Sequence, residues 1–217
     1  MTPSEPKIHG TVFIVDDDLS FLRSLSRLLT AVGYPVEAYG SAHDFFLRPA
    51  PERAGCVVAD LQMPGINGLQ LQETLRNGPN PLPVVFLTGQ GDIPTSVTAM
   101  RSGAEDFLTK RAAKEELLAA VQRAMERDAH ERQHRLRHRQ TRARMAELSE
   151  REREVLGHVV QGKMNKEIAA DLHINLRTVK LHRTNITRKL HVQSVAELTR
   201  LADEAGLLPP PPSGTGA

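Results

Sequence analysis

The stretch Val12-Phe13-Ile14-Val15-Asp16-Asp17-Asp18 places four apolar residues directly before three carboxylates. Such a run of β-branched and aromatic residues is typical of a buried strand. Four further short apolar runs follow within the first 126 residues, separated by segments with apolar residues at helical spacing; they lie at 36–39, 56–59, 84–87 and 107–108. This alternation predicts an α/β domain, a (βα)5 doubly wound parallel sheet with helices on both faces.

The charge of the chain divides it into two parts. The 217 residues carry a formal net charge of only +2. Residues 1–126 contain 11 basic and 15 acidic residues, a net charge of −4, whereas residues 127–217 contain 17 basic and 11 acidic residues, a net charge of +6. A split of this kind predicts two domains, of which the second binds a polyanion.

Composition also excludes several classes of protein. The single cysteine, Cys56, rules out a disulfide framework and a multi-cysteine zinc site, and it favours a reducing compartment. No apolar run approaches the length of about 20 residues that spans a bilayer. Residues 1–10 lack the apolar core of a signal peptide, so we expect a cytoplasmic protein without a membrane partner.

Residues 126–147 form the expected connection between the domains. The segment 127–144 holds seven Arg, three His and two acidic residues, and Leu136 is its one large apolar residue. A helix that is polar on all sides is typically solvated and bridges domains, so we predict a helical linker. A basic arm that contacts phosphates and a coiled-coil seam remain alternatives, although one Leu does not make a heptad stripe.

Residues 148–208 show only helical patterns and predict an all-α domain of four helices. Ser149 and Glu152 form a capping box at the start of the first helix. Asn165, Asn175 and Ser194 are the expected caps of the other three. The tail 209–217 is rich in Pro and Gly and is expected to be disordered.

Polar side chains follow four of the five predicted strands. Asp16 to Asp18 follow the first strand, Asp60 the third, Thr88 ends the fourth, and Lys110 follows the fifth. The carboxyl ends of parallel strands form the ligand crevice of an open sheet, where clustered carboxylates favour Mg²⁺. A hydroxyl and a lysine beside them fit the oxygens of a phosphoryl group carried on an aspartate.

Each of these residues alone has a purely structural alternative. Asp18 is a natural helix cap, Asp60 could be an ordinary loop carboxylate, and Lys110 could be a solvated lysine. Their placement at the ends of several strands of one sheet favours the phosphoryl site.

Four segments of the first 126 residues resemble the receiver domain of two-component response regulators: VDD at 15–17, DLQMPG at 60–65, TG at 88–89 and FLTK at 107–110. The resemblance covers residues 7–125 and implies the flavodoxin-like strand order 2-1-3-4-5. It implies that Asp60 accepts phosphate from a sensor histidine kinase. Asp17, Asp60 and the backbone carbonyl of Gln62 would bind Mg²⁺, with Asp16 acting through a water molecule.

The same resemblance implies roles for the later strands. Thr88 and Lys110 would hold the phosphoryl oxygens, and Phe107 would be the aromatic residue that moves with Thr88 as the switch. Gln62 and Gln90 occupy the positions that tune dephosphorylation. A receiver of this kind catalyses only its own phosphorylation and dephosphorylation, and it is not otherwise an enzyme.

Arg111 departs from the receiver pattern, because this family usually has a proline after the lysine, joined through a cis peptide bond. A cis bond before a residue other than proline costs about 3–4 kcal/mol. Either the loop absorbs this cost, or the bond is trans and Lys110 points elsewhere. We therefore expect acetyl phosphate to label the protein more slowly than an Arg111→Pro variant, and equal labelling rates would contradict this.

The predicted helix 176–190 carries the mixture of basic and amide side chains that reads a major groove, although a basic, solvated helix is the alternative from composition alone. The segments LSEREREVL at 148–156, NKEIA at 165–169 and TVKLH at 178–182 resemble the LuxR-type helix-turn-helix over residues 148–207. Lys180, Leu181 and Thr184 would then face bases, while Lys166, Arg183 and Lys189 would contact phosphates. The full set of expected DNA contacts is Lys166, Thr178, Lys180, Leu181, Arg183, Thr184, Asn185, Arg188 and Lys189.

Two histidines depart from that pattern, since His173 and His191 stand where this family often has glycine at helix ends. A small loss of stability without a change of fold is expected. The nine His of the chain show no spacing that supports a metal site.

Together the two resemblances indicate the FixJ/NarL class of response regulators, in the FixJ-like branch that includes the styrene-response regulator. Phosphorylation of Asp60 would favour a receiver state that forms a homodimer through its fourth helix and fifth strand, placing two recognition helices on operator half-sites. RNA polymerase is a further expected partner. Two alternatives remain, a metal-dependent phosphohydrolase and a DNA-binding regulator that does not need phosphorylation.

Overall fold

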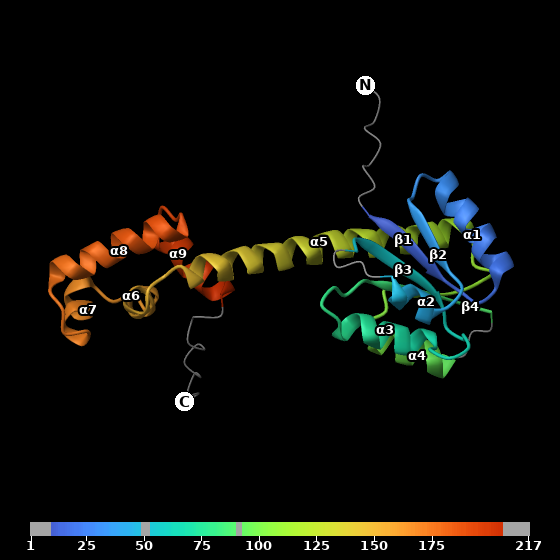
Figure 1. Cartoon of the computed structure of the whole chain (residues 1–217), viewed down its shortest axis with the longest axis horizontal. Coiled ribbons are helices and arrows are strands. Elements are labelled where there is room, and N and C mark those ends of the chain that lie inside the picture. Colours follow the sequence, from blue (N-terminus) through green and yellow to red (C-terminus); the bar gives the residue numbers. More distant parts are fainter. Residues whose placement is uncertain (1–9, 49–52, 90–92, 206–217) are drawn as a thin grey trace, which may run out of the picture. The chain divides into compact units, whose positions relative to one another are not determined.

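The computed structural model describes residues 10–48, 53–89 and 93–205 (Figure 1). The chain divides into two units, 1–132 and 133–217, each with its own hydrophobic core. Gln90 and the tail 209–217, about which the sequence made predictions, lie outside the described residues. Within the described ranges, no helix is both long and apolar enough to cross a membrane.

The first unit is built on a five-stranded parallel sheet in the predicted order β2-β1-β3-β4-β5. The strands are β1 (Thr11–Val15), β2 (Val36–Tyr39), β3 (Gly55–Asp60), β4 (Val84–Thr88) and β5 (Asp106–Thr109). The register aligns their carboxyl ends, since Val15 pairs with Ala59, Asp60 with Leu87, and Thr88 with Thr109.

Helices cover both faces of this sheet, which confirms the doubly wound architecture (Figure 1). Phe86 and Val57 belong to a core cluster with α2 (Ala42–Leu47), α3 (Gly68–Asn77) and α4 (Ile93–Arg101). On the other face, Ile14 and Val58 pack with α1 (Leu19–Ala31) and α5 (Lys114–Ala146). The alternation of side chains along each strand sends successive residues to opposite cores.

Helix α4 buries less of its apolar surface than its spacing suggests. Val97 and Met100 are 43% and 47% exposed, while Ala99 occupies the buried position. A small residue at that position brings the helix close to the sheet, and the larger apolar side chains are left on the outer surface.

The predicted linker is no separate element but the continuation of α5. This helix runs without a break from Lys114 to Ala146. Leu117, Val121 and Ala124 pack on the sheet, whereas most of the later side chains are polar. The first unit extends along the helix to Arg132, seven residues beyond the predicted receiver boundary at 125.

Asp128 explains why the first unit includes these additional residues. Its side chain is buried, and Oδ2 accepts a hydrogen bond from the backbone amide of Gly55 at 2.8 Å. Arg132 Nε lies 3.3 Å from the same oxygen. Gly55 has φ +133° and sits so close to Thr11 that a Cβ would lie 1.9 Å from the Thr11 carbonyl oxygen. The start of β3 is therefore tied to α5 by a carboxylate.

Replacing Asp128 with alanine is expected to lower the free energy of unfolding of the first unit by about 1–3 kcal/mol, because the buried Gly55 amide loses its acceptor. Both tyrosines of the chain, Tyr34 and Tyr39, lie in this unit, so tyrosine fluorescence in urea reports its unfolding alone. Glu126→Ala is the matched control, since Glu126 is exposed on the same helix. A midpoint for Asp128→Ala equal to that of the control would contradict the expectation.

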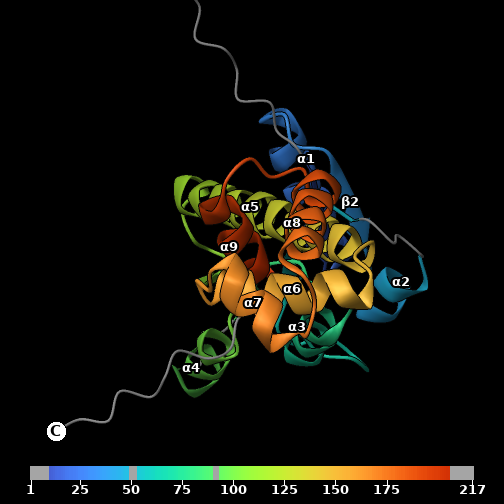
Figure 2. The same ribbon diagram turned by 90° about the vertical axis from the view of Figure 1, so that its left-hand side faces the viewer.

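The second unit contains the four predicted helices, α6 (Glu150–Val160), α7 (Asn165–Asp171), α8 (Leu176–Leu190) and α9 (Val195–Glu204) (Figure 2). Their core includes Val155, Ile168, Val179, Ile186 and Leu190, together with Leu148 and Leu198. This confirms a helical domain with a helix-turn-helix pair α7–α8.

Three of the four predicted caps of this unit are confirmed. Ser149 forms the capping box with Glu152, and the side chains of Asn175 and Ser194 cap α8 and α9. The prediction for Asn165 is wrong: Asn165 is the first residue of α7, and Met164 holds the cap position, where its backbone amide donates to Glu167. The Asn165 side chain instead accepts a hydrogen bond from α8.

Both unusual histidines adopt the left-handed conformation that glycine normally occupies. His173 has φ 51° and His191 has φ 54°. His191 follows the last residue of α8, where its backbone amide donates to the carbonyls of Thr187 and Arg188. The helices keep their expected ends despite the cost of a side chain in this region.

Candidate functional site

The carboxylates predicted to lie together do so. Asp16 follows β1 and Asp60 ends the neighbouring strand β3, so the parallel pairing brings them to one edge of the sheet. One carboxylate oxygen from each of Asp16, Asp17 and Asp60 can be chosen so that all three lie within 4.8 Å of one another. Asp16 and Asp60 are buried, and Asp17 is exposed. Three hard oxygen ligands, one of them open to solvent, fit a Mg²⁺ ion that retains water.

Asp18 has a different task from its two neighbours. Its Oδ1 accepts hydrogen bonds from the backbone amides of Ser20 and Phe21 at 2.8 and 3.1 Å, which caps α1 as expected. These hydrogen bonds hold the pKa of Asp18 below its usual value. The backbone amide of Asp18 in turn donates to Asp16 Oδ1 at 2.9 Å, so the start of α1 helps to orient Asp16.

Lys110 joins the two buried carboxylates. Its Nζ lies 2.6 Å from Asp16 Oδ2 and 2.8 Å from Asp60 Oδ2. The peptide bond between Lys110 and Arg111 is trans, yet the ammonium still points into the cluster. Of the two alternatives for this loop, the trans bond is observed without the expected redirection of Lys110. The slower labelling relative to Arg111→Pro stays a prediction.

The charges of this cluster influence one another. Burial raises the pKa of Asp16, although the Lys110 ammonium and the Asp18 amide work against this. Burial works to lower the pKa of Lys110, but its hydrogen bonds to Asp16 and Asp60 outweigh burial and raise it. Lys110 is therefore held as a cation beside carboxylates that carry more negative charge than it neutralises. The remaining negative charge of the cluster favours the binding of a second cation.

The backbone around Asp60 is shaped by contacts that the sequence motifs did not reveal. The amide of Gln62 lies 3.3 Å from Asp60 Oδ1, so the turn after β3 folds back on the carboxylate. Gly68 begins α3, where a Cβ would lie 2.5 Å from the Asp60 carbonyl oxygen and 2.8 Å from the ring of Phe86. Any larger residue at 68 would displace the loop that carries Asp60. In the sequence, a single glycine after a cap residue does not indicate such close packing.

Thr88 lies on β4, the strand next to that of Asp60, and Phe107 lies on β5, one strand further along the sheet. Thr88 is buried at the end of β4, and its carbonyl accepts a hydrogen bond from the amide of Lys110 at 2.8 Å. Phe107 is half-buried on β5, with its ring centroid 6.3 Å from that of Phe86. The pairing of β4 with β5 thus connects Thr88, Lys110 and Phe107 in one part of the sheet.

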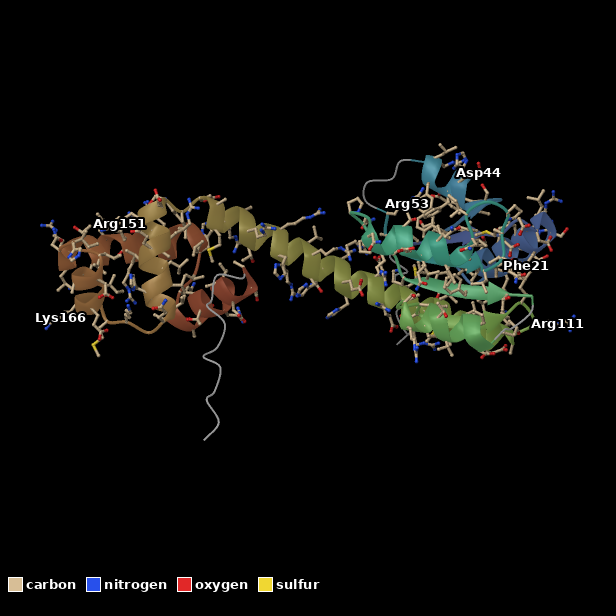
Figure 3. All side chains as sticks on the ribbon, turned by 90° about the horizontal axis from the view of Figure 1, so that it is seen from below. Phe21, Asp44, Arg53, Arg111, Arg151 and Lys166 are labelled. Carbon is tan, nitrogen blue, oxygen red and sulfur yellow. The ribbon has the colours of Figure 1, made fainter. Side chains whose placement is uncertain are left out.

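The second unit presents most of the predicted DNA contacts on exposed surface. On α8, Lys180, Leu181, Thr184 and Arg188 are exposed, and Leu181 reaches 58%. Lys166 is exposed on α7 and points away from the core of the unit (Figure 3). Thr178 and Asn185 are half-buried, Thr178 partly because its amide and hydroxyl bind the cap residue Asn175.

Two of the residues predicted to contact DNA form hydrogen bonds within the unit. Arg183 Nη1 donates to Asn165 Oδ1 at 2.9 Å, which ties α8 to α7. Lys189 Nζ binds Glu152 at 2.7 Å and the carbonyl of Glu147 at 3.1 Å, which ties α8 to the start of α6. Sequence reasoning missed the pair of Lys189 and Glu152, because 37 residues separate them and only the packing of α6 on α8 joins them.

Glu152 makes the stability of this unit depend on pH. Burial works to raise its pKa, but the hydrogen bonds from Lys189 and Ser149 outweigh burial and lower it. The stabilisation is therefore present above the ordinary value of 4.5 and is lost as the pH falls through the lower folded value. We expect Glu152→Gln to cost about 1–2 kcal/mol at neutral pH, with the difference from wild type shrinking in acid.

Thermal unfolding followed by far-UV circular dichroism between neutral pH and about pH 3 measures this difference. Glu154→Gln is the control, because Glu154 forms only an exposed ion pair with Arg151 on α6. A Glu152→Gln difference that does not change with pH would show that the carboxylate charge is irrelevant.

Comparison with known proteins identifies a family for each of the two units. Residues 12–122 match the family described as "Response regulator receiver domain", and residues 146–202 match "Bacterial regulatory proteins, luxR family". Nodulation protein W of Bradyrhizobium diazoefficiens is 38% identical over 94% of this chain and 90% of its own length. The transcriptional regulatory protein FixJ of Rhizobium meliloti is 39% identical over 92% of this chain and 98% of its own.

A solved structure shows the same two-part architecture. The response regulator StyR, known at low resolution, is 42% identical and superimposes with a TM-score of 0.81 over 89% of this chain and 98% of its own. The sheet order, the carboxylate cluster and the helix-turn-helix pair agree with these similarities. The chain belongs to the FixJ-like two-component response regulators, in which a receiver domain and a LuxR-type DNA-binding domain make transcription depend on phosphorylation.

Proposed function

We propose that Asp60 is the residue that accepts the phosphoryl group from a sensor histidine kinase. The observation that carries the proposal is the position of Lys110 Nζ, between Asp60 and Asp16 at 2.8 and 2.6 Å, in a cluster where three carboxylates converge. Mg²⁺ would be held by Asp16, Asp17, Asp60 and the backbone carbonyl of Gln62, and would neutralise charge on the incoming phosphoryl group.

In the transfer, an Asp60 carboxylate oxygen attacks the phosphorus atom of the donor. The new O–P bond forms as the bond from phosphorus to the donor histidine nitrogen breaks, and the imidazole leaves with the bonding electron pair. Lys110 would then exchange its contact with Asp60 for one with a phosphoryl oxygen, and Thr88 would donate its hydroxyl to another. Phe107 would follow Thr88 as the switch.

We infer that the phosphorylated receiver forms a homodimer through α4 and β5. The exposed Val97 and Met100 on α4 offer apolar area for such a contact. On β5, Asp106 forms an ion pair with Arg123 of α5. These two charged groups lie near that surface and would be able to form ion pairs with the second copy instead. Dimerisation would bring two α8 helices to half-sites about one turn of DNA apart.

For the DNA complex, we propose that the predicted DNA-contacting residues have different roles. Lys180, Leu181 and Thr184 would face bases from α8, with Thr178 and Asn185 beside them, whereas Lys166, Arg183 and Lys189 would contact phosphates, with Arg188 nearby. Lys189 also holds α8 on α6 through Glu152. RNA polymerase bound at the promoter is the proposed further partner, and the cytoplasm the proposed location.

The decisive experiment compares the oligomeric state and DNA binding with and without beryllofluoride in the presence of Mg²⁺. Size-exclusion chromatography with light scattering should show a shift toward dimer, and a promoter fragment should be bound more tightly. No change in either measurement would refute the switch. Steady turnover of a phosphomonoester by the same protein would instead favour the phosphohydrolase alternative.

A further inference from the structure

An aromatic ring covers the lysine of the phosphorylation site. The ammonium of Lys110 lies 4.7 Å from the centroid of the Phe21 ring on α1. The same ammonium also binds Asp16 and Asp60. A cation at this distance from a ring face is attracted by the ring quadrupole, and more strongly where water is partly excluded, as it is at Lys110.

Phe21 and Lys110 also line the same pocket. Between α1 and α5 lies a cavity of about 200 Å³ that Phe21 and Lys110 line together with Leu25, Leu28 and Leu117. This volume exceeds that of several water molecules. Without the ring, the flexible lysine side chain would have room to turn away from the carboxylates.

The residue after Lys110 gives no comparable support. Arg111 is exposed, and its side chain points outward at the same end of the unit as Phe21 (Figure 3). An exposed side chain therefore stands where receivers usually have the rigid ring of a proline. The lysine is held by its ion pairs and by the ring of α1.

We propose that Phe21 is a positioning residue for phosphoryl transfer, which holds the Lys110 ammonium beside Asp60, where it can contact an oxygen of the incoming phosphoryl group. This proposal rests on the proposed function of Asp60 and Lys110. It assigns to α1 a share in the chemistry that neither the receiver motifs nor the carboxylate cluster contains.

The test measures the affinity of the full-length protein for beryllofluoride with saturating Mg²⁺. Phe21→Leu, which keeps an apolar side chain but removes the ring, is expected to weaken beryllofluoride binding by about 3- to 10-fold. Phe21→Tyr retains a ring face and is expected to restore affinity to within about twofold of wild type. Mg²⁺ affinity in the absence of beryllofluoride should change little in either variant, because the carboxylates bind the ion.

Two further proteins separate positioning from general stability. Phe46→Leu removes a half-buried ring from α2, on the other face of the sheet, and should leave beryllofluoride affinity unchanged. In a Lys110→Met background, the added Phe21→Leu substitution should have no further effect, because the ring acts through the ammonium.

The outcomes distinguish this proposal from the function on which it rests. If wild type binds beryllofluoride and Phe21→Leu binds it equally well, or if the Phe21 and Lys110 effects add, the positioning role is refuted while the phosphorylation site stands. If Phe21→Tyr fails to restore affinity while folding normally, the ring is again not the cause. If wild type itself does not bind beryllofluoride, the assignment of Asp60 fails.

Discussion

The Asp60→Asn protein is expected to lose labelling by acetyl phosphate to below about 1% of wild type, because an uncharged amide is no nucleophile toward phosphorus. The substitution also removes one of the two carboxylates that bind Lys110 Nζ. In the presence of Mg²⁺ and acetyl phosphate, the variant should remain in the oligomeric state and at the DNA affinity of the unphosphorylated protein. Labelling is measured by mass spectrometry of the intact chain, and affinity by fluorescence anisotropy.

Asp18→Asn is the matched control for this prediction. Asp18 lies only two residues from Asp16, but its carboxylate caps α1, a task that asparagine performs as well. This variant should be labelled normally. An Asp60→Asn protein that dimerises and binds DNA as phosphorylated wild type does would support the alternative regulator that works without phosphorylation.

The second large effect is expected from Lys180→Ala, which should weaken binding to the operator by about 10- to 100-fold. Lys180 is exposed in the first half of α8, where its backbone carbonyl accepts a hydrogen bond from the hydroxyl of Thr184. Alanine keeps that carbonyl and favours helix, so the fold should persist. Binding to unrelated DNA should fall less, because a base contact adds specificity.

Anisotropy titrations at several salt concentrations, with operator and unrelated DNA, measure both effects. Arg200→Ala is the control, since Arg200 is an exposed basic residue on α9 of the same unit. This substitution removes the same charge as Lys180→Ala. If both variants lose affinity equally and for both DNAs, α8 acts only as a basic surface. The base-reading role of Lys180 would then be wrong.

Much of the fold and of the phosphoryl site followed from local patterns. The apolar runs that end in Asp16 and Asp60 predicted both the strands and the edge at which the carboxylates meet, because parallel strands align their carboxyl ends. Cap residues such as Ser149 and Asn175 marked helix starts through hydrogen bonds that span three residues. Such signals are local, so the sequence displays them directly.

Features that depend on long-range packing escaped prediction. Asn165 was assigned to the wrong role because its partner, Arg183, comes from the next helix. The pair of Lys189 and Glu152 depends on the packing of α6 on α8, which no local pattern indicates. The extension of the first unit beyond residue 125 depends on Asp128, whose partner Gly55 lies 73 residues earlier.

Local patterns in the sequence were enough to predict the order of strands and helices along the chain, the division into an acidic and a basic part, and the residue types at the phosphoryl site. Periodicity and charge are properties of short segments, and they survive in any arrangement of those segments. The tertiary structure decided which charges are neutralised inside each unit and which remain for a ligand. It directs Lys110 into the carboxylates beneath the ring of Phe21, and it leaves Lys180 exposed, because burial is fixed only when distant segments pack.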